Sequence, residues 1–327
     1  MRHRVSSTLL HKLAVLQSLI ITAILLASCA SGPRIPSSVW MTPVSAPPHE
    51  QWFRVSCASA LFCVANDGPH DVVAYNGRRW GGPTNIDPAG YPYALTAISC
   101  ASPSFCAAVD DYGNASTYNG TSWTVSRRFD SLRYGLLTWL SCASSSFCAA
   151  LDSVGDVFLF TDAAWSKPIP VDRNGTVTSI SCTSESFCVI GTTSGAIIYD
   201  GTRWIKQHID AGSVGIDSIS CVSTRFCEGV GYMHRQLVAI SYNGKGWNRP
   251  TTLGPDETAD SISCTSPRYC VAVENALGKV FVYRGGSWSE AQTIGPSGVQ
   301  LGQVSCSSLS FCVVVGMARA GSWWART

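Results

Sequence analysis

Short runs of alternating apolar and polar residues recur along most of the chain, and clusters of Gly, Asn, Asp and Ser separate them. One unit shows the order clearly, with strand-like runs at 95–100, 105–109, 115–118 and 123–127. Alternation of this kind, rich in β-branched and aromatic residues, is typical of half-buried strands. After the first 28 residues, no stretch of 11 residues has a convincing helical period. The pattern therefore predicts an all-β chain made of units of four antiparallel strands.

An eight-residue motif marks each unit. It reads Ser-Cys-x-Ser-x-x-Phe-Cys, with Tyr269 in place of Phe in one copy, and it occurs at 56–63, 99–106, 141–148, 181–188, 220–227, 263–270 and 305–312. Its first Cys recurs at steps of 43, 42, 40, 39, 43 and 42 residues. A period of this length is typical of the four-stranded blade of a β-propeller. The seven copies predict a seven-bladed propeller over residues 39–327.

The two ends of the chain are expected to close the ring together. The last repeat supplies strand-like runs at 313–315 and 321–326 and then ends without a fourth strand. Ahead of the first repeat, residues 39–43 include Trp40, which lies 17 residues before Cys57. A Trp lies the same distance before the first Cys of three later motifs. We therefore predict that this N-terminal strand joins the last blade, which removes an open sheet edge.

The two Cys of each motif are six residues apart and flank a tight turn, which places them opposite each other on neighbouring antiparallel strands. Zinc is the competing interpretation, but the spacing and the scarcity of His do not match the usual ligand pairs. Export across a membrane also favours oxidation. We predict no metal or other cofactor and seven disulfides: Cys57–Cys63, Cys100–Cys106, Cys142–Cys148, Cys182–Cys188, Cys221–Cys227, Cys264–Cys270 and Cys306–Cys312.

The other repeated positions predict structural roles. The two Ser of the motif are expected to bond to backbone groups of the turn. The aromatic residues are expected to pack between blades rather than to stack on carbohydrate. A second turn, Asn-Gly or Asp-Gly shortly before a Trp, suits the positive φ of a tight hairpin; it begins at Asn76, Asn119, Asp200 and Asn243. The unit at 161–165 lacks the Gly and is expected to turn differently.

The first 28 residues have the features of an export signal. Arg2, Arg4 and Lys12 precede an apolar run over 13–26, which is shorter than the ~20 residues that span a bilayer. The run ends in Leu-Ala-Ser-Cys, which resembles the lipobox of bacterial lipoproteins. That resemblance implies cleavage before Cys29 and a lipid, with diacylglycerol and palmitate, on the new amino-terminal residue. An ordinary signal peptide with an incidental thiol and an uncleaved anchor are the alternatives.

The cysteine count is consistent with this interpretation, because seven pairs use 14 of the 15 Cys and leave Cys29 over. We expect a signal peptide at 1–28 and a tether at 29–38 that reaches at most ~30 Å. The propeller at 39–327 would then be extracytoplasmic, monomeric and held at the cell membrane by its lipid.

Net charge argues against nucleic acid as a partner. Residues 1–28 hold three of the 23 Lys and Arg and none of the 21 Asp and Glu, so the mature chain has a net charge of −1. Such a chain lacks the basic field that phosphate backbones require. The chain also lacks the common nucleophile, zinc-hydrolase and phosphate-loop motifs.

Two family resemblances concern the repeats. The stretch at 99–109, followed by Tyr-Asn-Gly-Thr-Ser-Trp, resembles Cys-paired repeats of secreted actinobacterial proteins of largely undefined role. It implies a secreted propeller and no catalytic residues. The second turn is more weakly similar to the sialidase Asp-box, Ser-x-Asp-x-Gly-x-x-Trp. Here Asp200 or Asn119 directly precedes the Gly, so the pattern fails by one position.

Binding residues are expected on one face of the propeller. The uniform Cys and Asn-Gly turns share one face, while the irregular loops share the other, and irregular loops on a rigid scaffold usually carry function. An acidic set there would attract a cation such as calcium, or it would only cap its own turns. The candidate residues are Asp67, Tyr91, Tyr93, Asp110, Asp111, Tyr112, Arg133, Tyr134, Asp152, Asp156, His234, Arg235 and Glu274.

Three functions follow from these features. The leading hypothesis is a non-catalytic binding scaffold that takes an envelope protein, a glycan or a small ligand at the loop face. The second is a glycoside hydrolase or polysaccharide lyase that uses paired carboxylates at the propeller mouth. The third is a purely structural component of the cell envelope.

Overall fold

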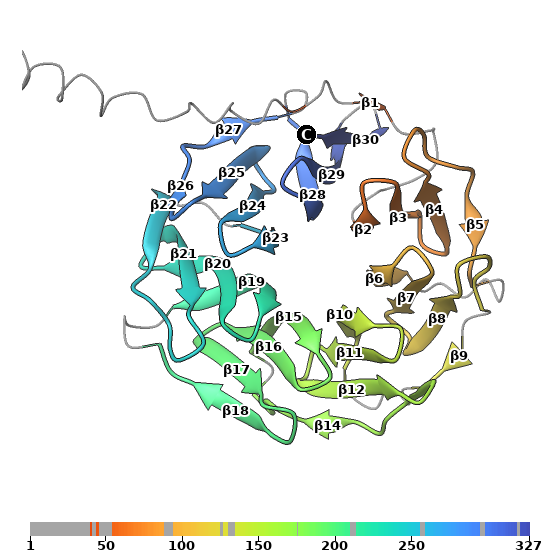
Figure 1. Ribbon diagram of the computed structural model, residues 1–327, viewed down its shortest axis with the longest axis horizontal. Helices are drawn as coiled ribbons and strands as arrows, with labels where there is room; N and C mark the ends of the chain where they lie inside the picture. The colour runs from red at the N-terminus through yellow and green to blue at the C-terminus, as the bar shows by residue number, and fades with distance from the viewer. Residues whose placement is uncertain are drawn as a thin grey trace, which may run out of the picture. The chain divides into compact units, whose positions relative to one another are not determined.

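The computed structural model describes residues 40, 44–45, 54–87, 94–124, 127–129, 135–174, 176–209, 214–255, 259–294, 298–318 and 321–327. Within the compact unit Trp40–Thr327, antiparallel sheets stand around a common centre as a β-propeller (Figure 1). No helix in this described part of the chain has the length and hydropathy needed to cross a bilayer.

Six sheets are blades that each use one continuous stretch of chain, with the first strand at the centre and the last at the rim. Blade 1 contains β2 (Val55–Ser59), β3 (Phe62–Asp67), β4 (Asp71–Tyr75) and β5 (Thr84–Asn85); blade 2 contains β6 (Leu95–Ser102), β7 (Phe105–Asp110), β8 (Asn114–Tyr118) and β9 (Arg127–Arg128); blade 3 contains β10 (Leu137–Ser144), β11 (Phe147–Asp152), β12 (Asp156–Thr161), β13 (Ala164–Trp165) and β14 (Ile169–Pro170). Blade 4 contains β15 (Val177–Ser184), β16 (Phe187–Thr192), β17 (Gly195–Tyr199) and β18 (Trp204–Gln207); blade 5 contains β19 (Gly215–Ser223), β20 (Phe226–Met233), β21 (Gln236–Tyr242) and β22 (Thr251–Pro255); blade 6 contains β23 (Ser261–Ser266), β24 (Tyr269–Glu274), β25 (Lys279–Arg284), β26 (Ser287–Trp288) and β27 (Gln292–Thr293).

The prediction of a seven-bladed propeller is wrong: in the described part of the chain six blades each use one continuous stretch, and a composite sheet closes the ring. This closing sheet joins β28 (Gln300–Ser308), β29 (Phe311–Ala318) and β30 (Gly321–Arg326) to β1 (Val44–Ser45) from the other end of the chain. Strand β1 begins after the expected 39–43 segment and has only two residues. The outer strand of the closing sheet is thus as short as β5 and β9, the outer strands of blades 1 and 2.

The prediction of four antiparallel strands per blade is confirmed, although the rim strand of blades 3 and 6 is split into two short segments. The interruption begins at Ser166 in blade 3 and at Ser289 in blade 6, directly after β13 and β26. In blade 3, the Ser166 hydroxyl accepts the Leu159 N–H at 3.0 Å and donates to the Lys167 carbonyl at 2.8 Å. Ser289 makes the equivalent pair of bonds in blade 6. A side-chain oxygen thus takes the place of a backbone acceptor, which interrupts the ladder.

The first Ser of every motif links one sheet to the next, a role that the sequence did not predict. Its hydroxyl accepts the N–H of the first Cys in the following motif, at 2.8–2.9 Å in all seven cases. The last bond of the series runs from the Cys57 N–H to Ser305 Oγ and joins the closing sheet to blade 1. These bonds form a closed circle around the centre of the ring.

The second Ser of the motif has the predicted role. In each turn its hydroxyl accepts the N–H of the residue two positions later, at 3.2–3.3 Å. The seven disulfides are also confirmed, with Cα atoms 3.9–4.0 Å apart in directly paired strands. Each disulfide therefore fixes the register of one central hairpin.

The second type of turn follows the sequence prediction closely. Asn76 Oδ1 accepts the N–H groups of the residues two and three positions later, and Gly77 has a φ of 87°. The turns at Asn119, Asp200 and Asn243 repeat this arrangement. The turn without Gly differs, because two consecutive non-Gly residues, Asp162 and Ala163, take φ of 51° and 60°.

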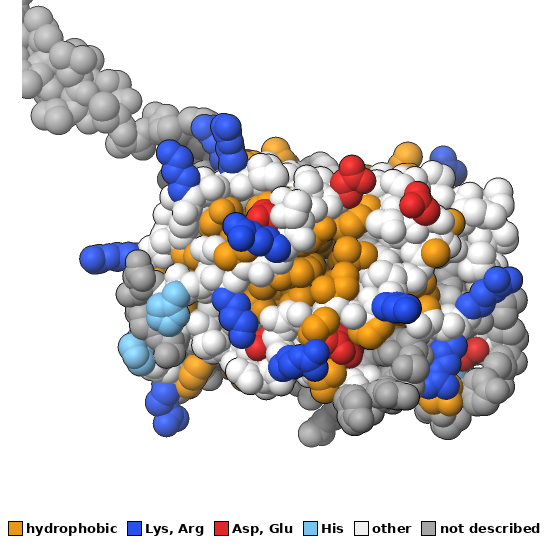
Figure 2. All heavy atoms as spheres, turned by 90° about the horizontal axis from the view of Figure 1, so that it is seen from below, with side chains coloured by type: hydrophobic (Ala, Val, Ile, Leu, Met, Phe, Trp, Pro, Cys, Tyr) orange, Lys and Arg blue, Asp and Glu red, His pale blue; other side chains and the backbone are white. Residues whose placement is uncertain are grey.

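Aromatic residues pack between neighbouring sheets, as predicted. The Trp165 ring stacks on Phe129 of the preceding blade with centroids 4.5 Å apart, and the Tyr75 ring lies 6.1 Å from that of Phe311 in the closing sheet. Trp40 packs against the cluster that includes Tyr269 and the last disulfide. On one side of the rim, hydrophobic side chains gather in the middle and Lys and Arg side chains surround them (Figure 2).

Candidate functional site

The propeller has two different faces. The turns between first and second strands and between third and fourth strands share one face, which we call the Cys-turn face. In blade 1 these turns are in contact, because a Cβ at Gly77 would come within 2.7 Å of Leu61 Cδ2. The remaining turns and the loops between blades form the opposite face, the loop face. The central channel opens onto it at a cavity of about 650 Å³.

β-bulges in the central strands bring polar residues to the channel. Each bulge adds one unpaired residue at the fourth position before the first Cys, and the inserted residues are Thr96, Thr138, Thr178 and Asp217. All four line the channel. A bulge turns the inserted side chain away from the regular ladder of paired residues. The residue type at this position can therefore differ between repeats, Thr in three and Asp in one, while the pairing on either side stays the same.

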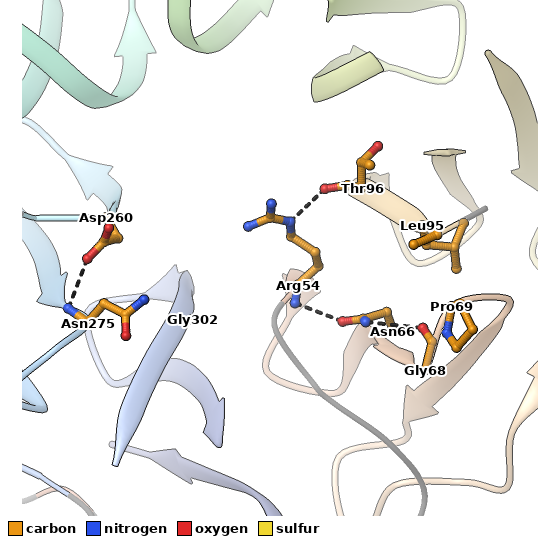
Figure 3. A pocket seen from close by; sticks show the side chains of 10 residues that line it. Arg54, Asn66, Gly68, Pro69, Leu95, Thr96, Asp260, Asn275 and Gly302 are labelled. Carbon is orange, nitrogen blue, oxygen red and sulfur yellow. Dashed lines mark hydrogen bonds between the residues drawn. The ribbon is translucent and has the colours of Figure 1, made fainter. Parts of the chain in front are cut away.

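Arg54 is the central side chain of the mouth cavity. Its Nε donates to the Thr96 carbonyl at 2.6 Å, and its backbone N–H donates to Asn66 Oδ1 at 2.8 Å. Figure 3 shows the guanidinium extending from blade 1 into the open space toward Asp260. Among the described residues, its terminal amino groups have no hydrogen-bond partner. They are therefore available to an acceptor that enters the cavity.

Two carboxylates lie across the channel from Arg54. Asp260 lines both the mouth cavity and the channel, whereas Asp217 lines the channel alone. Asp260 Oδ2 accepts the Asn275 N–H at 2.9 Å, while the Asp217 carboxylate has no hydrogen bond to any described residue. The site thus combines an open cation with two acceptors of opposite charge.

Burial perturbs all three ionisable groups. Burial within the channel walls, followed by repulsion from Asp260, raises the pKa of Asp217 to about 6. Burial also raises the pKa of Asp260, although the Asn275 N–H partly offsets this, and it lowers the pKa of Arg54. Asp260 is exposed at the mouth, but the protein atoms around its carboxylate replace much of the water that would otherwise hydrate it. Because burial disfavours the charged form of each group, a ligand that places an opposite charge beside it would be bound favourably.

The acidic residues predicted for the loop face cap their own turns. Asp110 Oδ1 accepts the N–H groups of Tyr112 and Asn114, each at 2.9 Å, and its Oδ2 accepts the Asn114 amide at 2.7 Å. Burial nevertheless raises the pKa of Asp110. Asp152 and Glu274 accept backbone N–H groups in the equivalent turns of blades 3 and 6. These contacts match the turn-capping alternative, and ligand binding by these residues stays a prediction.

The remaining candidate residues lie in several separate places. Asp67 is buried at the end of β3, Asp111 Oδ1 accepts the Ala94 N–H at 3.0 Å, and Asp156 starts β12. The Tyr112 ring lies 4.1 Å below the Arg128 guanidinium. His234 and Arg235 form the tip of a turn in blade 5, with φ of 49° and 64°. Cys29, Tyr91, Tyr93, Arg133 and Tyr134 lie outside the described residues.

Sequence reasoning missed Arg54, Asp217 and Asp260 because it searched the loops rather than the central strands. One signal was available. The residue four positions before the first Cys is Thr in three repeats and Asp in two, which breaks the apolar character of the strand. In the described part of the chain, no group of three His, Cys, Asp or Glu side chains is arranged to hold a metal ion.

No protein-family model matches the sequence, and no curated protein matches it. Solved propellers do match the fold. The WD40 repeats of RRP9 superpose with a TM-score of 0.70 at 11% identity, over 88% of this chain and 99% of that one. YCF48 bound to a D1 peptide gives 0.69 at 11%, over 90% and 99%. The WD40 propeller of Doa1 gives 0.69 at 11%, over 89% and 97%. The chain therefore has a WD40-like β-propeller fold.

Proposed function

We propose that this protein is a non-catalytic scaffold that holds a segment of a partner protein at the channel mouth. The observation that carries the proposal is the Arg54 guanidinium, which points into the mouth cavity and faces Asp260, and whose terminal amino groups have no partner among the described residues. A peptide segment supplies both matching groups, since it has carbonyl or carboxylate acceptors for Arg54 and ammonium or amide donors for the Asp side chains.

The surroundings of the cavity also suit a peptide. A volume of about 650 Å³ lies in the range of about 300–1,000 Å³ that is usual for ligand pockets. Leu277 is exposed two residues after Asn275, which lines the cavity. Its side chain can offer a bound segment an apolar contact beside the polar pocket. YCF48, a propeller with a similar fold, has been solved bound to a D1 peptide, which supports a peptide as the kind of partner proposed here.

The glycan-hydrolase alternative has one observation in its favour, the coupled carboxylates Asp217 and Asp260. Such enzymes need both carboxylates beside the scissile bond. Here only Asp260 lines the large mouth cavity, while Asp217 faces a channel of about 150 Å³. That volume is below the usual range for a ligand pocket. The geometry therefore favours binding over hydrolysis.

The peptide proposal is tested by selection from a random peptide display library. We expect the wild-type protein to enrich peptides that share an acidic and a basic residue. Arg54→Gln should weaken binding of the enriched peptides roughly tenfold to a hundredfold, because it removes charge-assisted hydrogen bonds. Arg173→Gln is the matched control, since Arg173 is exposed outside the cavity. Equal binding by Arg54→Gln, or enrichment of no peptide, would contradict the proposal.

We further propose that the scaffold is an extracytoplasmic lipoprotein anchored through Cys29. The disulfides support this, because they use every Cys except Cys29. In a bacterial expression host, we expect a clickable palmitate analogue to label the wild-type chain and the Ser28→Ala control. Cys29→Ser should abolish the label and release the protein from the membrane fraction. Label retained by Cys29→Ser would place the lipid elsewhere, and no label on the wild-type chain would exclude it.

A further inference from the structure

In one half of the Cys-turn face, every charged side chain of the turns is a cation. This half, which we call the basic sector, consists of the turns of blades 5 and 6, the closing sheet and blade 1, whose central strands follow one another around the ring. Its turns span residues 59–62, 76–79, 223–226, 243–246, 266–269, 284–287 and 308–311 and contain no Asp or Glu. They contain six cations: Arg78, Arg79, Arg225, Lys245, Arg268 and Arg284.

The other half of the Cys-turn face has a different composition. In blades 3 and 4, the corresponding turns carry Asp162, Glu185 and Asp200 against the single cation Arg203. Arg203 Nε lies 3.4 Å from Asp200 Oδ2, so its charge is compensated. Positive charge is therefore concentrated in the basic sector, although the chain as a whole is nearly neutral.

Two exposed leucines lie within the basic sector. Leu61 is 70% exposed and Leu309 is 62% exposed, at the tips of the turns in blade 1 and the closing sheet. The equivalent turn tips of other blades carry Ser, Thr, Pro, Glu or Arg. Leu61 lies against Gly77, in the turn that also presents Arg78 and Arg79. Large apolar side chains among cations are the combination that inserts into the interface of an anionic membrane.

The channel mouth opens on the face opposite to the basic sector, since loop-face residues such as Pro69 and Asn275 line it.

We propose that the basic sector is a docking surface for an anionic phospholipid membrane. The cations are drawn to lipid phosphates, and Leu61 and Leu309 enter the headgroup region. The channel mouth then points away from the membrane, toward partners. This inference goes beyond the peptide-binding proposal and does not depend on a lipid at Cys29.

Vesicle binding by the body Trp40–Thr327 tests the surface by itself, because this compact unit holds all seven disulfides and the whole closing sheet. We expect it to co-sediment with vesicles of phosphatidylglycerol and phosphatidylcholine, and not with phosphatidylcholine alone. Arg78→Gln/Arg79→Gln should weaken binding about 25-fold, at roughly fivefold per cation. The fold is retained because the backbone N–H groups still bond to Asn76. Leu61→Ser/Leu309→Ser should weaken binding about tenfold or more.

The matched control is Arg127→Gln/Arg173→Gln, which removes the same charge from exposed residues outside the basic sector and should change binding less than twofold. An equal loss in this control would mean that net charge alone drives binding, and would overturn the proposal. So would undiminished binding by Arg78→Gln/Arg79→Gln, or no binding to anionic vesicles. If soluble polyphosphate displaces the protein and the Leu variants bind normally, the surface recognises a soluble polyanion instead. Peptide selection by Arg78→Gln/Arg79→Gln should be normal, which separates this proposal from that for the mouth.

Discussion

Replacing Glu228 with Gln is expected to stabilise the protein above pH 7 and to leave its stability unchanged at low pH. Glu228 is 1% exposed and follows the second Cys of the blade 5 motif, where the other repeats have Val or Ala. Ser241 Oγ donates to its Oε2 at 2.5 Å, and Trp288 Nε1 of blade 6 donates to its Oε1 at 3.3 Å. The carboxyl group thus links two blades from an otherwise apolar position.

Burial raises the pKa of Glu228 from 4.5 to about 7, and the two hydrogen bonds offset only part of that shift. The folded state therefore holds this proton more tightly than the unfolded chain does. Stability associated with Glu228 is fully present below pH 4.5 and is lost as pH rises toward and through 7. The loss is roughly 3 kcal/mol, from about 1.4 kcal/mol per unit of pKa difference. Gln is neutral throughout and avoids this loss.

Urea unfolding of both proteins between pH 4 and pH 8 measures this effect. The difference in unfolding free energy between Glu228→Gln and the wild type should rise from near zero to roughly 3 kcal/mol. Taking the difference cancels other titrating groups such as Asp217. Glu290→Gln is the control at an exposed site and should remain close to wild type at every pH. A constant difference across this range would show that Glu228 ionises normally.

The same carboxyl group explains an exception among the tryptophans of the rim. The indole N–H groups of Trp40, Trp204 and Trp247 are buried and have no hydrogen-bond partner among the described residues. Trp288 occupies the equivalent position in blade 6, but its N–H reaches Glu228 of blade 5. An unpaired buried N–H costs free energy, so the hydrogen bond of Trp288 stabilises blade 6 relative to a blade whose indole N–H is unpaired. Because the acceptor is an ionisable carboxyl group, this contact is also sensitive to pH.

Local features of this fold and the aromatic packing between blades were predictable, but the hydrogen bonds between blades were not. The disulfides depend on two Cys six residues apart, and the Asn-Gly turns depend on adjacent residues, so sequence spacing determines both. The first Ser of the motif bonds to a Cys in the next sheet, 40–44 residues further on except where the ring closes. In the sequence this Ser looks the same as the second Ser, which only caps its turn. Only the curvature of the ring brings its partner within reach.

The candidate site was missed for a related reason. Alternation assigns each strand residue to one of two faces, but a bulge shifts the residues that follow it. Strict alternation would not place Asp217 in the channel, but the bulge between Ile216 and Ser218 does. The acidic residues of the loops were more conspicuous in the sequence, yet Asp110, Asp152 and Glu274 satisfy backbone N–H groups of their own turns. Composition identified acidic loops but did not indicate which carboxylates remain available.

Ser305→Ala is expected to destabilise the ring at the point where it closes, by about 1–3 kcal/mol. The Ser305 hydroxyl accepts the Cys57 N–H at 2.8 Å across the junction between the closing sheet and blade 1. Alanine leaves that partly buried N–H without a partner. The outer strand of the closing sheet offers little compensation, since β1 pairs through only two residues.

Ser308→Ala is the matched control in the same motif, because its hydroxyl accepts an exposed N–H, that of Ser310, which water then satisfies. We expect a loss below about 0.5 kcal/mol there. Denaturant unfolding measured with the disulfides intact gives both values, and hydrogen exchange at the Cys57 amide reports the local opening. Equal losses in the two variants would mean that both Ser merely cap turns. A larger loss and faster exchange in Ser305→Ala alone would show that the circle of Ser–Cys bonds holds the two ends of the chain together.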